Sequence, residues 1–162
     1  ALFIFALACA RRMPAWTFIL RCHPQLPMRQ ALRLVPGISQ QPNLILSEDR
    51  PIEADFARAS ALLYRGSSTV MYAILHGLLP VCVQVKGLSD RDPIYAMVGW
   101  RRRSATPEET AALLERCERM PEAERAAEWA AAARYVREYT GPVSDDRIEA
   151  LLDAVGLNGR AA

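Results

Sequence analysis

The sequence predicts an α/β fold in which a Rossmann-like, doubly wound parallel sheet is followed by a helical tail. Short, continuous apolar segments alternate with helical segments along the first hundred residues, a pattern typical of parallel strands that helices cover on both faces. Right-handed crossovers between such strands give the doubly wound arrangement. With 162 residues, 51% of them hydrophobic and 23% charged, the chain has the size and composition of one globular domain.

Four strands and four helices are expected in a Rossmann-like nucleotide-binding domain over residues 1–105. The strands are short apolar segments bounded by proline, glycine or polar residues, at residues 16–22, 43–47, 61–64 and 80–85. The helices are expected at residues 2–13, 27–34, 51–59 and 67–76. Pro14 closes the first helix and Gly77 follows the last one, as is usual where helices end.

A wholly helical tail, residues 106–162, is predicted to pack on this domain. Thr106 and Glu109 form a capping-box pattern around Pro107, a residue favoured at the first helical position. The expected helices cover residues 107–120, 121–139 and 145–155. Ser144 precedes the last helix and Gly156 ends it.

The chain begins inside a predicted helix, and no initiating methionine is present. In a doubly wound domain the first strand lies at the centre, between the second strand and the fourth. This sequence opens with the helix that should follow that strand, so we expect the first strand to be missing. The strands at 16–22 and 61–64 should then either face a gap or close up on each other.

Charge and cysteine patterns exclude several classes of protein. Twenty Lys and Arg against eighteen Asp and Glu leave a formal net charge of +2, without the basic excess usual in proteins that bind nucleic acid. Four cysteines, Cys9, Cys22, Cys82 and Cys117, are scattered and form no C-x-x-C pair. No metal site is therefore expected, and all four are interpreted as reduced core residues.

The apolar run from Ala1 to Ala10 is too short to span a bilayer. Arg11 and Arg12 follow this run, whereas the charges of a signal peptide precede its apolar segment. The expected localisation is therefore cytoplasmic.

The joint between the third strand and its helix offers a candidate anion site. Residues 64–69 read Tyr-Arg-Gly-Ser-Ser-Thr, and ligands bind at the carboxyl ends of parallel strands in doubly wound proteins. The first turn of a helix presents unpaired N–H groups to a phosphate. Gly66 lets the backbone come close, while Ser67, Ser68 and Thr69 add hydroxyl donors. The alternative interpretation is that Ser67 is an ordinary helix N-cap.

A second candidate segment follows the first strand, on the same edge of the predicted sheet. Arg21, Cys22, His23 and Pro24 are consecutive there. An arginine supplies positive charge, and a histidine can donate a hydrogen bond to a phosphate or a proton to a leaving group. Alone, a His-Pro pair is more typical of a structural histidine. Its interest lies in the convergence of two such loops on one edge.

Together these segments resemble the C-terminal domain of bacterial GT-B glycosyltransferases. The resemblance rests on a strand that ends in His23-Pro24, then a strand–Gly66-Ser67-Ser68-Thr69–helix unit, then Gly77-x-x-Pro80-Val81. The pairing of the two motifs is similar to bacterial sialyltransferases, Kdo transferases of capsule synthesis and CDP-glycerol glycerophosphotransferases. It covers roughly residues 16–100, and residues 135–142 also look like the end of surface-polysaccharide transferases.

The resemblance implies roles for individual residues. His23, with Arg21, and the run Gly66, Ser67, Ser68 and Thr69 would hold the donor phosphates, and His23 would stabilise the leaving phosphate. The loop with Ser47, Glu48, Asp49 and Ile52 lies where these enzymes place the base. Tyr72 stands where many GT-B enzymes carry a ribose-binding glutamate. Asp90 or Asp92 could replace that glutamate, although aspartates in such a loop are more often solvated turn residues.

Trp100-Arg101-Arg102-Arg103 is the one basic cluster of the sequence. One interpretation is contact with an anionic membrane surface or a lipid-linked acceptor, at the inner face of the membrane. The other is an ordinary solvated edge.

The leading functional hypothesis is the donor-binding half of a glycosyltransferase that moves a sugar, or a sugar-like unit, to a surface glycan. The donor would be a nucleotide-activated sugar, CMP- or CDP-linked by the resemblance, with no further cofactor. The glycan or lipid-linked acceptor and the general base would belong to an N-terminal domain absent from this chain, which alone should bind a nucleotide without turnover. A nucleotide-sugar 2-epimerase-like half and a non-catalytic Rossmann-like binding domain are the alternatives. Upstream sequence would discriminate between them.

Overall fold

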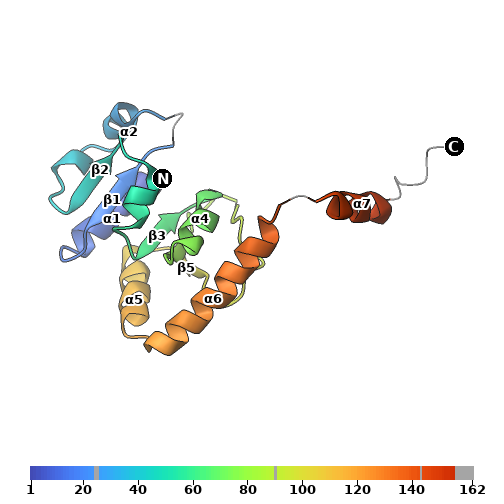
Figure 1. The fold of residues 1–162 in the computed structure, drawn as a ribbon. Coiled ribbons are helices and arrows are strands. Elements are labelled where there is room, and N and C mark those ends of the chain that lie inside the picture. Colours follow the sequence, from blue (N-terminus) through green and yellow to red (C-terminus); the bar gives the residue numbers. More distant parts are fainter. Residues whose placement is uncertain (24–25, 90, 143, 156–162) are drawn as a thin grey trace.

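Parallel strands flanked by helices form the centre of the molecule in the computed structural model (Figure 1). The structure describes residues 1–23, 26–89, 91–142 and 144–155. In chain order the elements are α1 (Leu2–Arg12), β1 (Phe18–Arg21), α2 (Met28–Leu34), the 3-10 helix η1 (Ile38–Gln40), β2 (Leu44–Ser47), α3 (Ile52–Phe56), β3 (Ala61–Tyr64), α4 (Thr69–Leu75), β4 (Leu79–Val83), β5 (Arg102–Ser104), α5 (Pro107–Glu118), α6 (Glu122–Tyr139) and α7 (Asp145–Ala154).

The described strands pair in two parallel sheets. β1 pairs with β2, with Phe18 opposite Leu44. β4 pairs with β3 on one side and with β5 on the other. The predicted α/β class with parallel strands is therefore confirmed, and the arrangement is consistent with a Rossmann-like fold.

Strand β5 was missed by the sequence patterns, which assigned its residues to a basic cluster. Arg102 lies opposite Val81 and Ser104 opposite Val83 in the parallel ladder with β4. The segment carries no apolar run, and its pairing depends on β4 and on two anchors. Ser104 Oγ is 2.7 Å from Thr110 Oγ1, and Arg102 Nη2 donates to Glu128 Oε2 of α6 at 2.7 Å.

The main core surrounds the three-stranded sheet. Every residue of β4 is buried, as expected for a parallel strand with neighbours on both sides and cover on both faces. Trp100 is almost wholly buried, and its indole Nε1 donates to Leu78 O at 3.1 Å. A second, smaller core joins α1, α2, η1 and the two-stranded sheet.

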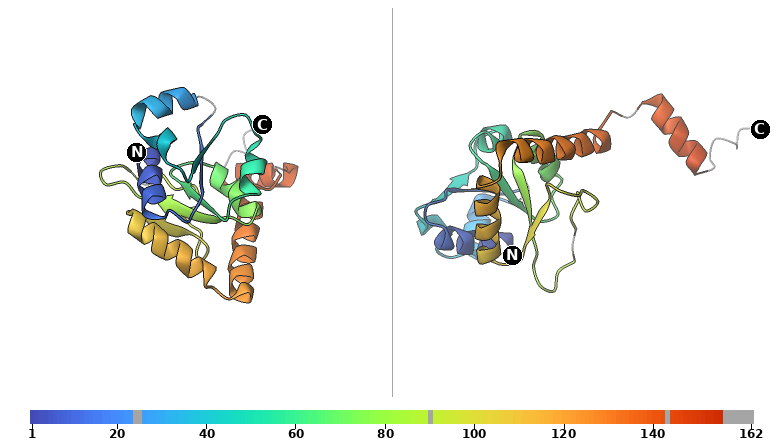
Figure 2. Two further views of the ribbon diagram at one scale, coloured as in Figure 1. Left: turned by 90° about the vertical axis from the view of Figure 1, so that its left-hand side faces the viewer. Right: turned by 90° about the horizontal axis from the view of Figure 1, so that it is seen from below.

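Helices α1 and α5 lie side by side (Figure 2). The predicted capping box at the start of α5 is confirmed, because Glu109 N donates to Thr106 Oγ1 at 3.1 Å. The Glu109 carboxylate reaches back to the backbone N–H of Ala105, at 2.7 Å, one residue before the N-cap. The helix is therefore held at its first turn by two reciprocal hydrogen bonds.

Helix α7 differs from α5 and α6, because none of its residues is buried. It extends away from the other elements in Figures 1 and 2. Its predicted start is confirmed by Ser144, whose Oγ accepts from the Arg147 N–H at 3.4 Å. Gly156, the predicted end, lies outside the described residues.

Candidate functional site

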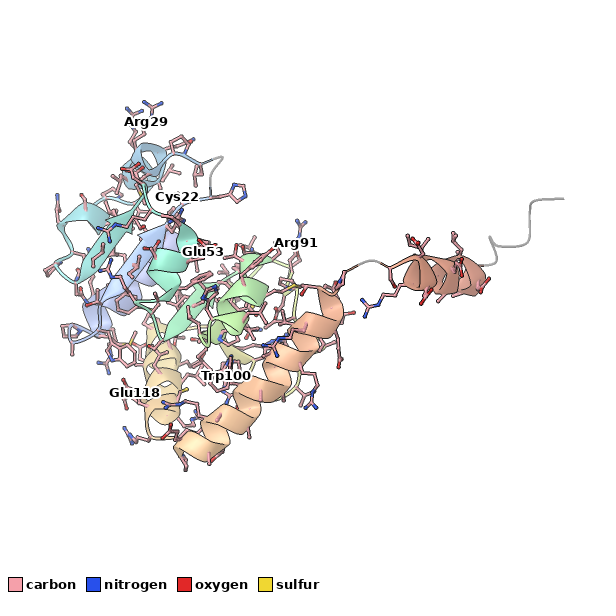
Figure 3. All side chains as sticks on the ribbon, in the orientation of Figure 1. Cys22, Arg29, Glu53, Arg91, Trp100 and Glu118 are labelled. Atoms are coloured by element: carbon pink, nitrogen blue, oxygen red, sulfur yellow. The ribbon has the colours of Figure 1, made fainter. Side chains whose placement is uncertain are left out.

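Within each of the two sheets the strands are parallel, so their carboxyl ends lie at one edge of that sheet. In Figure 3, Cys22, after β1, and Arg91, after β4, both lie toward the upper side of the molecule, whereas Trp100 and Glu118 lie toward the opposite end. We call the residues that follow β1, β3 and β4 here the carboxyl rim. Its described members are Arg21, Cys22, His23, Arg65, Gly66, Ser67, Ser68, Thr69, Ser89 and Arg91.

The loop after β3 makes a tight turn at Gly66. Its φ of +68° lies in the left-handed region, which favours glycine. A Cβ at this position would also come within 3.3 Å of the Arg91 carbonyl oxygen. Both the turn and the close approach of the neighbouring loop therefore require glycine here.

The three hydroxyl residues after Gly66 have different environments. Ser67 Oγ accepts from the Thr69 N–H at 3.3 Å, so part of its role is the local one of closing a turn. Helix α4 begins at Thr69 rather than at Ser67 as predicted, and Ser68 makes no side-chain cap. Ser68 is exposed, and its hydroxyl is the one most accessible to a ligand.

The loop after β4 is tied to the end of β3. Arg65 Nη2 donates to Ser89 O at 2.9 Å, and Tyr64 OH donates to Asp92 Oδ1 at 2.7 Å. These contacts bring Arg65 and Arg91 to the rim beside the serines. Neither arginine was among the predicted site residues, although both are adjacent to motifs that the sequence showed.

Asp92 is buried, and its predicted role as a ribose ligand is wrong. Its side chain is fully buried, and both carboxylate oxygens are occupied. Oδ1 accepts from Tyr64 OH and from the Ile94 N–H, and Oδ2 accepts from Arg101 Nε at 2.5 Å. The alternative of a solvated turn residue is also wrong. Asp90 lies outside the described residues.

The protonation states of this buried cluster follow from its contacts. Burial alone would raise the pKa of Asp92, but the hydrogen bonds from Tyr64, Arg101 and the Ile94 N–H outweigh it, and the pKa is lowered. Burial, with the Asp92 hydrogen bond, raises the pKa of Tyr64 well above its ordinary value. A carboxylate, a guanidinium and a neutral phenol therefore coexist, and both oxygens of the carboxylate are paired. Arg101 Nη2 is buried without a partner among the described residues.

A second polar cluster lies at the end of β1 and β2. Arg21 Nη1 and Ser47 Oγ both donate to Asp55 Oδ2 of α3, at 3.0 and 2.7 Å. Arg21 is thus partly neutralised, and Ser47 is buried, so neither side chain is displayed freely to a ligand. Asp55 was not predicted, because its partners lie 34 and 8 residues away. Its other oxygen, Oδ1, is buried with no partner among the described residues.

The remaining predicted residues are dispersed. His23 lies at the rim after β1, while Pro24 lies outside the described residues. Glu48 and Asp49 are exposed after β2. Ile52 begins α3 and Tyr72 is 65% exposed on α4, so the structure does not gather them into one base or ribose site.

The basic cluster is mostly engaged within the protein. Arg101 pairs with Asp92, and Arg102 pairs with Glu128, with side-chain exposures of 14% and 20%. These two side chains therefore do not form a basic patch that faces a membrane. Among the described residues no helix is long and apolar enough to cross a bilayer, and no group of three or more His, Cys, Asp or Glu is placed to hold a metal ion.

The four cysteines are free thiols in the structure. Cys9 and Cys82 are buried, whereas Cys22 and Cys117 are half-buried. The interpretation of core residues thus holds fully for two of them.

A groove separates β1 from β3. It has a volume of about 760 Å³ and runs along both strands, lined by residues 17–21 of one and 60–63 of the other. The two strands that the predicted motifs follow therefore lie on opposite sides of a groove.

No protein-family model matches the chain, and no curated protein or solved structure gives a significant match.

Proposed function

We propose that the carboxyl rim binds the phosphate of a nucleotide, and that the chain is the donor-binding half of a glycosyltransferase of the GT-B type. The observation that carries the proposal is that the loops after β3 and β4 leave one edge of their sheet, with Cys22, after β1, on the same side of the molecule as Arg91 (Figure 3). Ligand sites of α/β proteins lie at this edge.

The chemistry of the rim suits an anion. Arg65 holds its guanidinium at Ser89 O of the loop after β4, and the Arg91 backbone of the same loop approaches Gly66, so two arginines belong to the loops around Gly66. Ser68 adds an exposed hydroxyl, and the left-handed turn at Gly66 allows a ligand to approach the backbone. Hydrogen bonds between charged donors and phosphate oxygens are roughly twice as strong as neutral ones.

In a transfer reaction these donors would stabilise charge on the departing nucleotide phosphate, an electrostatic contribution to catalysis. His23, across the groove, would add a hydrogen bond or a proton. The preference for CMP- or CDP-linked donors rests on the motif resemblance. The general base that activates an acceptor hydroxyl is assigned to another domain, so we expect this chain to bind a nucleotide without turnover.

Calorimetric titration with CMP, CDP, UDP and GDP tests the proposal directly. We expect binding, tightest for the cytidine nucleotides. Ser68→Ala should weaken it by roughly tenfold to a hundredfold, as for a lost phosphate contact of about 1.5–3 kcal/mol. Ser60→Ala is the matched control, because Ser60 is an exposed serine at the opposite end of β3. A folded chain that binds none of the four nucleotides would refute the proposal. Equal effects of Ser68→Ala and Ser60→Ala would mean that the phosphate binds at another place.

A further inference from the structure

The groove between β1 and β3 is bounded on both sides by strand edges. β1 pairs with β2 on its other side, and β3 pairs with β4 on its other side. The groove has a volume of about 760 Å³. That is a large space for the interior of a sheet protein, whose voids are normally few and small.

Backbone groups of both strands point into the groove. The Phe18 N–H donates to Asn43 O, on the β2 side, and the Leu79 N–H donates to Ser60 O, on the β4 side. Because backbone groups alternate between the two edges of a strand, those of Ile19, Ala61 and Leu63 face the groove. Buried N–H and C=O groups are almost always paired in proteins.

The remaining walls are mostly apolar and lie on both faces of the strand layer; their charged members are Asp55, Arg58 and Glu118. Leu2, Phe3 and Ala6 of α1 and Leu114 of α5 line the groove, as do Ile52 and Phe56 of α3. Side chains alternate between the faces of a strand, and Leu62, on the opposite face from Ala61 and Leu63, belongs to a cluster with Phe56. Whatever fills the groove is therefore covered from both faces.

Helix α1 runs in the opposite direction to the strands. Asn43, just before β2, donates from Nδ2 to the carbonyl oxygens of Ala10 and Met13, so the end of α1 lies at the amino edge. Its start, at Leu2, consequently lies toward the carboxyl edge. The 11 residues of α1 span about 16 Å, close to the roughly 17 Å of a five-residue strand.

We infer that the groove is the seat of one further parallel strand, an extended apolar segment whose carboxyl end leads by a short loop into Ala1. The strand order then becomes β2-β1-new-β3-β4-β5, the order of a doubly wound sheet whose first strand is central. α1 is the crossover helix from the new strand back to β1. The strand carries about five residues, apolar on both faces, as parallel strands covered by helices do.

Asp55 gives the carboxyl end of this strand a second feature. Asp55 lines the groove, is buried, and has one carboxylate oxygen without a partner among the described residues. A backbone N–H or a side-chain donor at the end of the new strand satisfies it. A strand explains more of the groove than a small apolar ligand does, because a ligand of that kind leaves the facing backbone groups of Ile19, Ala61 and Leu63 unpaired.

The test is to attach a five-residue Val- and Ile-rich segment and a two-residue Gly-Asp loop to Ala1 of the full chain, without nucleotide. We expect amide hydrogen exchange at Ile19, Ala61 and Leu63 to slow by at least about tenfold, the effect of about 1.4 kcal/mol, and the melting temperature to rise. The matched control carries proline at the centre of the added segment, where a central strand excludes it. It should behave like the unextended chain.

A second variant distinguishes pairing of the added strand from a mere gain in solubility. Leu63→Pro removes an N–H that faces the groove but leaves the residues that pair with β4, Leu62 and Tyr64, unchanged. In the extended chain it should abolish the added protection at Ile19. The inference is overturned if the extension leaves all three exchange rates unchanged, if the proline control protects equally, or if these amides are already protected in the unextended chain. If the same peptide slowed exchange when added separately but not when attached, the proposed connection of the strand to Ala1 would be overturned. None of these outcomes depends on nucleotide binding.

Discussion

The three-stranded and two-stranded halves of the molecule differ in how completely their strands are enclosed. All five residues of β4 are buried, whereas only Leu20 is buried in β1. Both strands are apolar or mostly so, and both are parallel. The two strands differ in the number of paired edges, because β4 has a neighbouring strand on both edges and β1 has one among the described strands. Burial of a strand in this fold thus depends on its neighbours as much as on its own side chains.

The polar contacts show the same contrast. In the three-stranded half, both carboxylate oxygens of Asp92 have partners, one of them a guanidinium. In the two-stranded half, Asp55 has one oxygen with partners and one without, and its guanidinium partner, Arg21, is 31% exposed. Each cluster keeps one buried polar atom without a partner among the described residues, Arg101 Nη2 in the first and Asp55 Oδ1 in the second. Only the second cluster borders the groove.

The largest expected effect is that of Asp92→Asn. It leaves the half-buried Arg101 without its buried counter-charge, and breaking such a pair typically costs about 3–5 kcal/mol of folding free energy. Asp55→Asn, in the second cluster, should cost about 1–3 kcal/mol, because Arg21 can turn to solvent. Urea unfolding of both variants measures the two free energies. Equal losses would mean that the two clusters stabilise the fold equally.

Asn43→Ala should come next and act mainly on the two-stranded half. Asn43 Nδ2 donates to three backbone carbonyls, those of Ala10, Met13 and Trp16, at 2.8–3.0 Å. Leaving such acceptors unpaired costs about 1–3 kcal/mol. Gln41→Ala, which removes only a contact to the Asn43 side chain, is the control. Hydrogen exchange should accelerate in β1 and β2 before β3 and β4, and uniform acceleration would contradict independent halves.

Acid should weaken the three-stranded half through Asp92. The pKa of this carboxyl is lowered in the fold from an ordinary value of 3.8, so the stabilisation it gives is present above that value and is lost as pH falls below about 4. At any pH above the folded pKa of Asp92, the unmodified chain should lose less free energy of unfolding to acid than the Asp92→Asn substitution removes. The free energy of unfolding, followed between pH 7 and pH 3, should fall more steeply in the unmodified chain than in Asp92→Asn. Parallel curves would disprove the assignment.

The smallest effects compare two helix caps. Thr106→Ala removes the cap of α5, which packs against α1 and β5, and should cost about 1 kcal/mol of global stability. Ser144→Ala removes a similar cap from α7, which buries no residue. It should lower the helix content of α7 without moving the global unfolding transition. Circular dichroism and thermal unfolding of the two variants separate these outcomes, and a global shift in Ser144→Ala would show that α7 is part of the cooperative unit.

The elements that the sequence predicted are those held by local signals. The four expected strands are present, and the capping residues Thr106 and Ser144 begin their helices as predicted. Each of these signals acts between residues at most a few positions apart, so no knowledge of the fold is needed to detect it.

The site could be predicted only in outline. The rule that parallel strands end on one edge placed His23 and Ser68 on the same side of the molecule. It could not show that Asp92 points inward to Tyr64, or that Arg91 approaches Gly66, because those contacts join loops 25 to 28 residues apart.

By itself, then, the sequence determined the α/β class, the parallel strands and the ends of most helices, since apolar periodicity and capping are properties of short segments. Only the tertiary structure made a strand of Arg102–Ser104, because β4 supplies the hydrogen-bonding edge and Asp92 and Glu128 neutralise the neighbouring arginines. The sequence left open whether the strands at 16–22 and 61–64 would face a gap or close up on each other, and only the tertiary structure decided for a groove between β1 and β3. That choice depends on how α1, α3 and α5 pack around the strands, and no short segment encodes such packing.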